Sequence, residues 1–344
     1  MAENKITKAV FFDVQDYEER PLLEGKPDNC EFVLINEPFH ESFDANLDKV
    51  RDAEILSVFT SSRVGGDKLS MLPNLKLIAT RSTGYNNIDR EYCQEKGIAV
   101  VNVPRYGEST VAEYTFALLL NVARKVSQAY DALKEGEIDL NSYIGIDLCD
   151  KTIGIIGTGA IGCHVAKIAY GFGMKILSFD IFPKEEIKQK YDVEYVGLDE
   201  LLERSDIISI HAPSTKENFH MLNDEAFSRM KDGVIIVNTA RGEIVDTKAL
   251  YKALKSGKVA GAGLDVVECE EILANEEFYL TKTECIQQEC LERTLINHKM
   301  LDLPNVIVTP HIAFNSVEAI GRILSTTISN IKSYLTGNIV NRVI

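Results

Sequence analysis

One short stretch constrains the fold of this 344-residue chain more than any other. The apolar run 152–156 leads directly into Gly157-x-Gly159-x-x-Gly162, and a helix-like apolar pattern follows. A strand, a glycine-rich turn and a helix in this order are typical of a dinucleotide-binding α/β unit. Gly157 permits a sharp turn, Gly159 leaves room for a pyrophosphate, and Gly162 allows close packing of helix on strand.

A second predicted strand, Lys175 to Asp180, ends in an acid 18 residues after Gly162. A carboxylate at this place accepts hydrogen bonds from the adenosine ribose and repels a 2′-phosphate. The phosphates would lie at the N-terminus of the helix. The pattern therefore predicts NAD rather than NADP as the cofactor. The alternative is a tight turn in an unrelated parallel α/β domain. It does not explain why a strand, the glycine turn, a helix, a second strand and an acid follow one another at the expected spacing.

The composition is that of an ordinary globular protein, with 45% apolar residues in a chain long enough for two domains. A net charge of −15 argues against nucleic acid or an anionic membrane as partner, because phosphates would be repelled. No apolar run is long enough to span a membrane, and the first residues lack the apolar core of a secretory signal. We therefore expect a cytoplasmic protein.

The seven cysteines are odd in number and scattered, and no Cys-x-x-Cys pair occurs. We therefore expect neither a structural zinc site nor a disulfide framework. The charged segment 270–302 contains Cys285, Cys290 and His298, whose spacing fits no standard zinc pattern. For this segment we expect a solvated surface helix and no metal.

Strand-like and helix-like runs alternate in both halves of the chain. In the first hundred residues the apolar runs are 8–14, 30–36, 53–59, 74–81 and 98–103; from residue 151 they are 152–156, 175–180, 206–211, 233–238, 259–266 and 306–309. Such runs predict parallel sheets covered on both faces. The last predicted helix, Val317 to Leu335, follows the second series, and we expect it to return to the first domain.

The predicted fold is therefore α/β, with two doubly wound parallel-sheet domains. A flavodoxin-like substrate domain is formed by both chain ends, residues 1–104 and 313–344, and a Rossmann NAD-binding domain by residues 105–312. Ser109 to Val126 predicts a helix that is apolar nearly all round. Such a helix is buried on several sides, so we expect it between domains or against a second subunit, and we expect a homodimer.

Three residues with suitable chemistry each follow a predicted strand: Arg241, Glu270 and His311. Parallel strands bring their carboxyl ends to one edge, so these residues should converge. A histidine titrates near neutrality and therefore suits proton transfer. An arginine can donate two parallel hydrogen bonds to one carboxylate. A carboxylate beside the imidazole favours the charged form of the ring. Each residue alone has an ordinary explanation in capping, packing or surface charge, and Glu268 is a rival for Glu270.

The same segments resemble the signatures of the D-isomer-specific 2-hydroxyacid dehydrogenases. The similarity is carried by 237–246, 261–270 and 309–313, together with 81–89, 102–113 and 211–213. It is strongest to the branch that reduces pyruvate to D-lactate with NADH. The resemblance implies Arg241 as the residue that binds the substrate and polarises its carbonyl, Glu270 rather than Glu268 as partner of the histidine, and His311 as proton donor.

The resemblance also implies roles for the surroundings of this triad. Besides the three glycines, the cofactor would be bound by Ala160, Ile161, Asp180, Ala212, Pro213, Asn218, Thr239, Ala240 and Asp265. A small 2-oxo or 2-hydroxy acid would be bound by Thr83, Gly84, Tyr85, Tyr106, Phe59 and Phe314. D-Lactate dehydrogenases often carry an aromatic residue after the last of these, where this chain has Asn315, which bears on the size of the side-chain pocket.

Three alternatives remain open from the sequence. The first is a relative that acts on a bulkier 2-oxo acid, and the second is one that acts on phosphite, because the Arg, Glu and His set is shared among them. The third is a non-enzymatic NAD(H)-sensing scaffold, similar to the C-terminal-binding corepressors. No long tail for partner binding is present in the sequence, which favours an enzyme.

Overall fold

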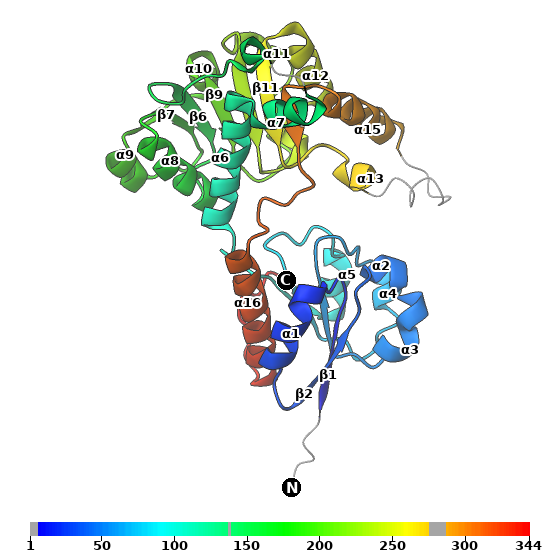
Figure 1. Cartoon of the computed structure of the whole chain (residues 1–344). Helices are drawn as coiled ribbons and strands as arrows, with labels where there is room; N and C mark the ends of the chain where they lie inside the picture. Colours follow the sequence, from blue (N-terminus) through cyan, green and yellow to red (C-terminus); the bar gives the residue numbers. More distant parts are fainter. Residues whose placement is uncertain (1–5, 137–138, 275–286) are drawn as a thin grey trace. The chain divides into compact units, whose positions relative to one another are not determined.

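The computed structural model describes residues 6–136, 139–274 and 287–344, in two compact units (Figure 1). Unit 1 comprises Met1–Tyr106 and Ser316–Ile344, and unit 2 comprises Gly107–Asn315. Each unit contains one wholly parallel sheet covered by helices. The predicted fold class, two parallel-sheet α/β domains, is confirmed. The domain boundaries expected from the sequence differ from these by two or three residues. The roles given to the two domains stay predictions.

Unit 1 has a five-stranded sheet in the order β2-β1-β3-β4-β5. Its strands are β1 (Thr7–Phe11), β2 (Cys30–Leu34), β3 (Ile55–Val58), β4 (Leu77–Thr80) and β5 (Ala99–Val101). Every residue of the central strands β3 and β4 is buried, as a sheet covered on both faces requires. Each strand of this sheet lies on one of the predicted apolar runs.

Two helical layers cover the sheet of unit 1. On one face lie α1 (Asp16–Gly25) and α16 (Val317–Leu335), which bring the two chain ends together over Phe11 and Leu77 (Figure 1). On the other lie α2 (Phe39–Ser42), α3 (Leu47–Val50), α4 (Gly66–Leu69) and α5 (Arg90–Lys96). A short 3-10 turn, Asp44–Asn46, links α2 and α3.

Unit 2 has a seven-stranded sheet in the order β12-β11-β10-β9-β6-β7-β8. The strands are β6 (Thr152–Ile156), β7 (Lys175–Phe179), β8 (Val193–Tyr195), β9 (Ile207–Ile210), β10 (Val234–Asn238), β11 (Val259–Leu264) and β12 (Val306–Val308). Only β8 was not predicted. It is a three-residue edge strand with one fully buried side chain, too short to give an alternating pattern.

The helices of unit 2 also form two layers. One face is covered by α6 (Glu108–Arg124) and α8 (Ala160–Gly171), the other by α10 (Leu198–Arg204), α11 (Asp224–Arg229), α12 (Thr247–Ser256) and α15 (Gln288–Leu301). The remaining elements are α7 (Val126–Glu135), α9 (Glu185–Tyr191), α13 (Glu270–Ala274) and the 3-10 turns Leu140–Tyr143 and Gly242–Ile244. Among the described residues, no helix is both long enough and apolar enough to cross a membrane.

Helix α6 is buried inside unit 2 itself, where Ala112, Phe116 and Leu119 join the core next to α8, β10 and β11. Its burial therefore does not require a second subunit. The helix also ends earlier than predicted, because Lys125 adopts the left-handed conformation (φ 53°) and α7 begins after it. Large exposed apolar side chains follow this break: Val126, Tyr130, Leu133, Leu140, Ile144 and Ile146.

The expectation that the cysteines form no disulfide is wrong for one pair, because Cys269 and Cys290 are joined across 21 residues of sequence. Linear spacing carries no information about this contact, which arises because α15 returns to the segment that follows β11. The expectation of one solvated helix over 270–302 is also only partly right. Helix α15 buries Thr294, Asn297 and Met300, while residues 275–286, including Cys285, lie outside the described residues.

Candidate active site

The segments after β10, β11 and β12 share one edge of the sheet of unit 2, because these three strands are parallel neighbours. Arg241 lies in the turn after β10. This turn is fixed by Asn238, whose Nδ2 donates to the carbonyl of Arg241 (2.9 Å) and whose Oδ1 accepts from the backbone N–H of Ala240 (3.0 Å). The arginine is therefore presented by a turn that the last residue of the strand holds in shape.

His311 lies in the turn after β12 with a left-handed backbone (φ 54°), a conformation that is strained for a residue with a side chain. The surroundings hold it there. Its backbone N–H donates to the carbonyl of Asp265 (2.9 Å). The buried carboxylate of Asp265 also accepts from Thr309 Oγ1 (2.6 Å) and from the backbone N–H groups of Ile312 (2.9 Å) and Ala313 (2.8 Å). Asp265 thus anchors the whole turn.

The imidazole of His311 is paired with Glu270, with 2.7 Å between Nδ1 and Oε1. Burial lowers the pKa of His311, but the hydrogen bond and the negative charge of Glu270 raise it by more, and the net pKa is raised even though the charge of Arg241 opposes this. The charged imidazolium therefore persists to higher pH than in a free histidine. The three strand ends bring a histidine, its carboxylate partner and an arginine charge into one place.

The glycine loop between β6 and α8 leaves the start of the helix uncovered. Gly157 has φ 91°, and a Cβ there would lie 2.8 Å from the backbone of His211. A Cβ on Gly162 would lie 2.0 Å from the carbonyl oxygen of Gly157, so the helix packs here without space for a side chain. Gly159 opens on free space and caps α8 with no side-chain hydrogen bond. The first N–H groups of α8 are thus open to an anion.

The acid at the end of β7 is held by the same loop. Asp180 Oδ2 accepts from the backbone N–H (2.5 Å) and the hydroxyl (2.8 Å) of Thr158, and its Oδ1 accepts from the N–H of Phe182 (2.7 Å). Burial raises the pKa of Asp180, but these hydrogen bonds lower it by more, so the net pKa is lowered. An ionised carboxylate therefore stands beside the glycine loop, where a ribose would be bound.

The family model of the D-isomer-specific 2-hydroxyacid dehydrogenase NAD-binding domain matches residues 116–313. The chain belongs to this family. The D-isomer-specific 2-hydroxyacid dehydrogenases are NAD-dependent oxidoreductases, and NAD is the cofactor of this chain.

Individual proteins show the same relationship. A 2-hydroxyacid dehydrogenase homolog of Schizosaccharomyces pombe is 37% identical over 342 residues, covering 96% of this chain and 97% of that protein. An aromatic 2-oxoacid reductase of Clostridium sporogenes is 40% identical over 262 residues, 76% of each chain. The crystal structure of D-lactate dehydrogenase from Aquifex aeolicus with NAD and lactic acid has a TM-score of 0.84 at 36% identity, covering 97% of this chain and 99% of that one.

The other cofactor residues expected for this dehydrogenase lie after β9 and β10. Ala212 and Pro213 follow β9, and Asn218 closes their loop by donating to the carbonyl of Pro213 (2.7 Å) and accepting from the N–H of Thr215 (2.7 Å). Thr239 is buried and shares a hydrogen bond with a threonine of α6. Ala160 and Ile161 open α8, and Ala240 precedes Arg241. Their contacts with the cofactor remain predictions.

Five of the six predicted substrate residues follow the neighbouring strands β3, β4 and β5 of unit 1: Phe59, Thr83, Gly84, Tyr85 and Tyr106. Phe314 belongs to unit 2. The turn after β4 is shaped by side chains, since Thr83 Oγ1 donates to the carbonyl of Val103 (2.9 Å) and Asn102 Nδ2 to that of Thr83 (2.8 Å). The backbone N–H of Phe59 is held by Asp13 Oδ2 (3.2 Å).

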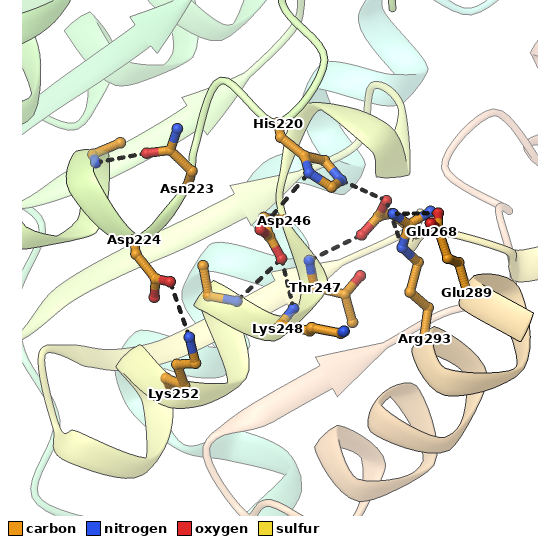
Figure 2. Close-up of polar contacts among 12 residues, drawn as sticks. His220, Asn223, Asp224, Asp246, Thr247, Lys248, Lys252, Glu268, Glu289 and Arg293 are labelled. Carbon is orange, nitrogen blue, oxygen red and sulfur yellow. Dashed lines mark hydrogen bonds and ion pairs between the residues drawn. The ribbon is translucent and has the colours of Figure 1, made fainter.

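The choice between Glu268 and Glu270, which local sequence left open, is made by geometry. Glu270 pairs with His311, whereas Glu268 Oε1 lies 2.8 Å from His220 Nε2 in a separate buried cluster (Figure 2). Sequence reasoning missed His220, Thr158 and the positioning role of Asp265. No local pattern marks them, because each acts on a residue more than twenty positions away or through a backbone group.

Proposed function

We propose that this protein reduces pyruvate to D-lactate with NADH, reversibly. The observation that carries the proposal is the pair of His311 and Glu270 within reach of the charge of Arg241, at the sheet edge that also carries the glycine loop. The likeness to the Aquifex aeolicus D-lactate dehydrogenase supports the choice of substrate. When bound, the nicotinamide supplies the hydride.

His311 is the proton donor in this proposal. Its Nδ1 is engaged with Glu270, so Nε2 is the ring nitrogen that gives a proton to the carbonyl oxygen as the alcohol forms. The carboxylate of Glu270 stabilises the imidazolium before transfer and fixes the orientation of the ring. In the oxidation of the alcohol, the neutral ring takes the proton back.

Arg241 binds the substrate carboxylate and polarises the neighbouring carbonyl. A guanidinium is suited to both tasks, because its planar fork donates two parallel hydrogen bonds to a carboxylate and stays charged at every relevant pH. Its Nη1 donates to the carbonyl of Ala240 (2.6 Å), which restrains the side chain. The remaining donors of the guanidinium serve the substrate.

The cofactor would be held by the loop and the acid described above. The pyrophosphate would lie against Gly159, Ala160 and Ile161 at the start of α8, where the backbone N–H groups and the helix dipole favour an anion. Asp180 would accept hydrogen bonds from the ribose hydroxyls, and its negative charge disfavours the 2′-phosphate of NADP. Ala212, Pro213, Asn218, Thr239, Ala240 and Asp265 complete the proposed set.

In unit 1, we assign the substrate carboxylate to the backbone N–H groups of Thr83, Gly84 and Tyr85 and to the hydroxyl of Tyr106. These positions follow β4 and β5, which are adjacent in the sheet. We assign the border of the substrate side chain to Phe59 and Phe314.

The first experiment compares NADH oxidation with pyruvate, hydroxypyruvate, 2-oxoisocaproate and phenylpyruvate, and it determines the chirality of each product. Fast turnover of pyruvate to the D isomer is the expected result. A strong preference for the larger acids would overturn the choice of pyruvate but keep the reaction. A separate assay follows NAD⁺ reduction with phosphite, and turnover of phosphite alone would replace the substrate class. Tight NADH binding without turnover in either assay would favour the NAD(H)-sensing scaffold.

A bulkier 2-oxo acid is the second candidate substrate. Two observations favour it: the 40% identity to an aromatic 2-oxoacid reductase of Clostridium sporogenes, and Asn315 in place of an aromatic residue after Phe314. A smaller side chain there would leave a wider pocket. Replacing Asn315 by Tyr should then lower the rate with phenylpyruvate more than the rate with pyruvate.

We propose a homodimer in the cytoplasm as the working form. Tyr130 and Leu133 of α7 and Leu140 after it are exposed apolar side chains, and a second copy would remove such side chains from water. Sedimentation analysis of Leu133→Glu beside the unaltered protein tests the assembly, because a charge in the interface should give monomers. Cell fractionation tests the location.

A further inference from the structure

The six-residue segment from Asp265 to Glu270 supplies two of the contacts that place His311. Asp265, at its start, anchors the turn of His311, and Glu270, at its end, pairs with the imidazole. The segment also contacts the turn of Arg241, because a Cβ on Gly242 would lie 2.2 Å from the carbonyl carbon of Val267. The path of this one segment therefore sets the geometry of all three catalytic candidates.

Glu270 itself is held weakly. Only its Oε1 is hydrogen-bonded, to His311, while its Oε2 is buried with no hydrogen-bond partner among the described residues. The residue before it, Cys269, has a left-handed backbone (φ 55°), which is strained for a residue with a side chain. The position of the carboxylate thus depends on what holds the backbone just before it.

The side chain of Glu268 is one of the groups that hold this backbone, together with Asn297 and the disulfide of Cys269. The Glu268 side chain is 2% exposed, and Figure 2 shows it at the centre of a cluster drawn from three other parts of unit 2. Oε2 accepts from the N–H of Thr247 (2.9 Å), and Oε1 lies 2.8 Å from His220 Nε2 and 3.3 Å from Arg293 Nε. Its own carbonyl accepts from Asn297 Nδ2 (2.8 Å).

One face of α15 contributes most of this support. Cys290, Arg293 and Asn297 are spaced so that they lie on the same side of the helix, and they contact Cys269, the carboxylate of Glu268 and the carbonyl of Glu268, respectively. Helix α15 also packs on α12, at whose N-terminus Thr247 lies. The backbone at Glu268 and at the strained residue Cys269 is therefore held by contacts with α12 and α15.

We propose that Glu268 is a positioning residue for the dehydrogenase reaction: by fixing the 268–270 backbone to α12 and α15, it keeps the carboxylate of Glu270 on His311. The inference rests on the proposed function of His311 as proton donor. Glu268 has no part in proton transfer, and its effect is exerted through Glu270. Its loss would let the 268–270 backbone relax and the pair with His311 loosen.

The test is Glu268→Gln, which keeps the shape and removes the charge that Arg293 and His220 face. With the 2-oxo acid that the unaltered enzyme reduces fastest, kcat should fall on the order of tenfold, because small displacements of catalytic groups are costly. The alkaline limb of the kcat/KM profile should move to lower pH, since the imidazolium loses Glu270 while Arg241 and Asp265 still face it. NADH affinity should stay unchanged.

A double-variant cycle separates positioning from a general loss of stability. If Glu268 acts through Glu270, Glu268→Gln should move the alkaline limb in the native background but not further in a Glu270→Gln background. Arg293→Met provides a milder second variant with a smaller shift in the same direction. Glu292→Gln is the matched control, because Glu292 also bridges α15 and α12 through Lys248 but is exposed.

The outcomes are distinct. A folded Glu268→Gln enzyme with unchanged kcat and pH profile would overturn the positioning role, as would equal shifts in both backgrounds of the cycle. A lower melting temperature with an unmoved alkaline limb would leave Glu268 as a stabilising residue only and also overturn it. If instead His311→Gln retained normal turnover, the proposed function would fail first, whatever the Glu268 variants do.

Discussion

Two histidine–carboxylate pairs in unit 2 use acids that are two residues apart, yet their surroundings differ. Glu268 pairs with His220, is 2% exposed, and has both oxygens engaged by other groups of the protein. Glu270 pairs with His311, is 37% exposed, and has one oxygen engaged. Each pair has an arginine nearby: Arg293 contacts Glu268 directly, whereas Arg241 acts on His311 by its charge.

The difference separates a structural pair from a chemical one. In the pair of His220 and Glu268, most polar groups of the acid are saturated by the protein, so the pair stabilises a fixed arrangement. In the pair of His311 and Glu270, one carboxylate oxygen is left without a hydrogen-bond partner among the described residues. Both histidines have a left-handed backbone, φ 52° for His220 and 54° for His311, so backbone strain does not distinguish the two pairs. Unsatisfied polar groups of this kind are common where a protein binds or converts a ligand.

The largest expected effect is that of His311→Gln. Glutamine keeps the approximate size but cannot donate a proton as an imidazolium does, so turnover of the 2-oxo acid should fall by about a thousandfold. NADH affinity, measured by fluorescence titration, should be unchanged. Near-normal steady-state rates in this variant would show that the pair of His311 and Glu270 has only a structural role, like the pair of His220 and Glu268.

Arg241→Lys should have the next largest effect. A lysine retains the charge but loses the two parallel hydrogen bonds to a carboxylate, so kcat/KM should fall about 30- to 100-fold, with both KM and kcat affected. Steady-state kinetics with pyruvate measure this split. Equal kinetics for the lysine variant would mean that the arginine contributes charge alone, as a distant cation.

Glu270→Gln should lower kcat/KM by about tenfold at neutral pH and change its pH dependence. Glu270 raises the pKa of His311, and reduction needs the protonated ring, so activity is lost as pH rises through that pKa. Without the carboxylate the pKa falls, and the alkaline limb moves to lower pH. A pH profile that coincides with that of the unaltered enzyme would contradict the pairing.

The smallest effect on activity is expected for His220→Leu, which removes both ring nitrogens. Removing this partner leaves Thr247 and Arg293 on Glu268, so the alkaline limb of the pH profile should not move. Stability should fall by about 1–3 kcal/mol, because a buried carboxylate loses a hydrogen bond, and urea unfolding measures this. A shift of the pH profile as large as that of Glu270→Gln would erase the distinction between the two pairs.

Much of the fold was predictable because its signals are local. Helix α16 has the predicted bounds, Val317–Leu335, and every strand except β8 lies on a predicted apolar run. Continuous apolar runs of strand length report burial on both faces wherever they occur. The predicted end of one helix, Val126, was two residues late, because Lys125 adopts φ 53° and ends α6 at Arg124.

The members of the candidate site were predicted from the sequence, and the family resemblance also predicted the pair of Glu270 and His311, which the structure contains. Arg241, Glu270 and His311 were identified from motifs that follow strands, and Asp180 and the glycines from their spacing. The disulfide between Cys269 and Cys290 was missed, and so was the cluster around Glu268. Both depend on α15, which packs against a segment about twenty residues before it in the chain.

The sequence by itself determined the parallel α/β architecture and the glycine loop. It also predicted the acid that we propose for the ribose and the three catalytic candidates, because these follow from spacing along one strand or turn. The local pattern left Glu268 and Glu270 as rivals, and the family resemblance favoured Glu270 for His311. Only the tertiary structure showed that Glu268 pairs with a different histidine, His220. Glu268 and Glu270 lie in the same short segment and have the same chemistry. Their roles differ because the left-handed turn at Cys269 and the packing of α15 direct one side chain into the core and the other to His311.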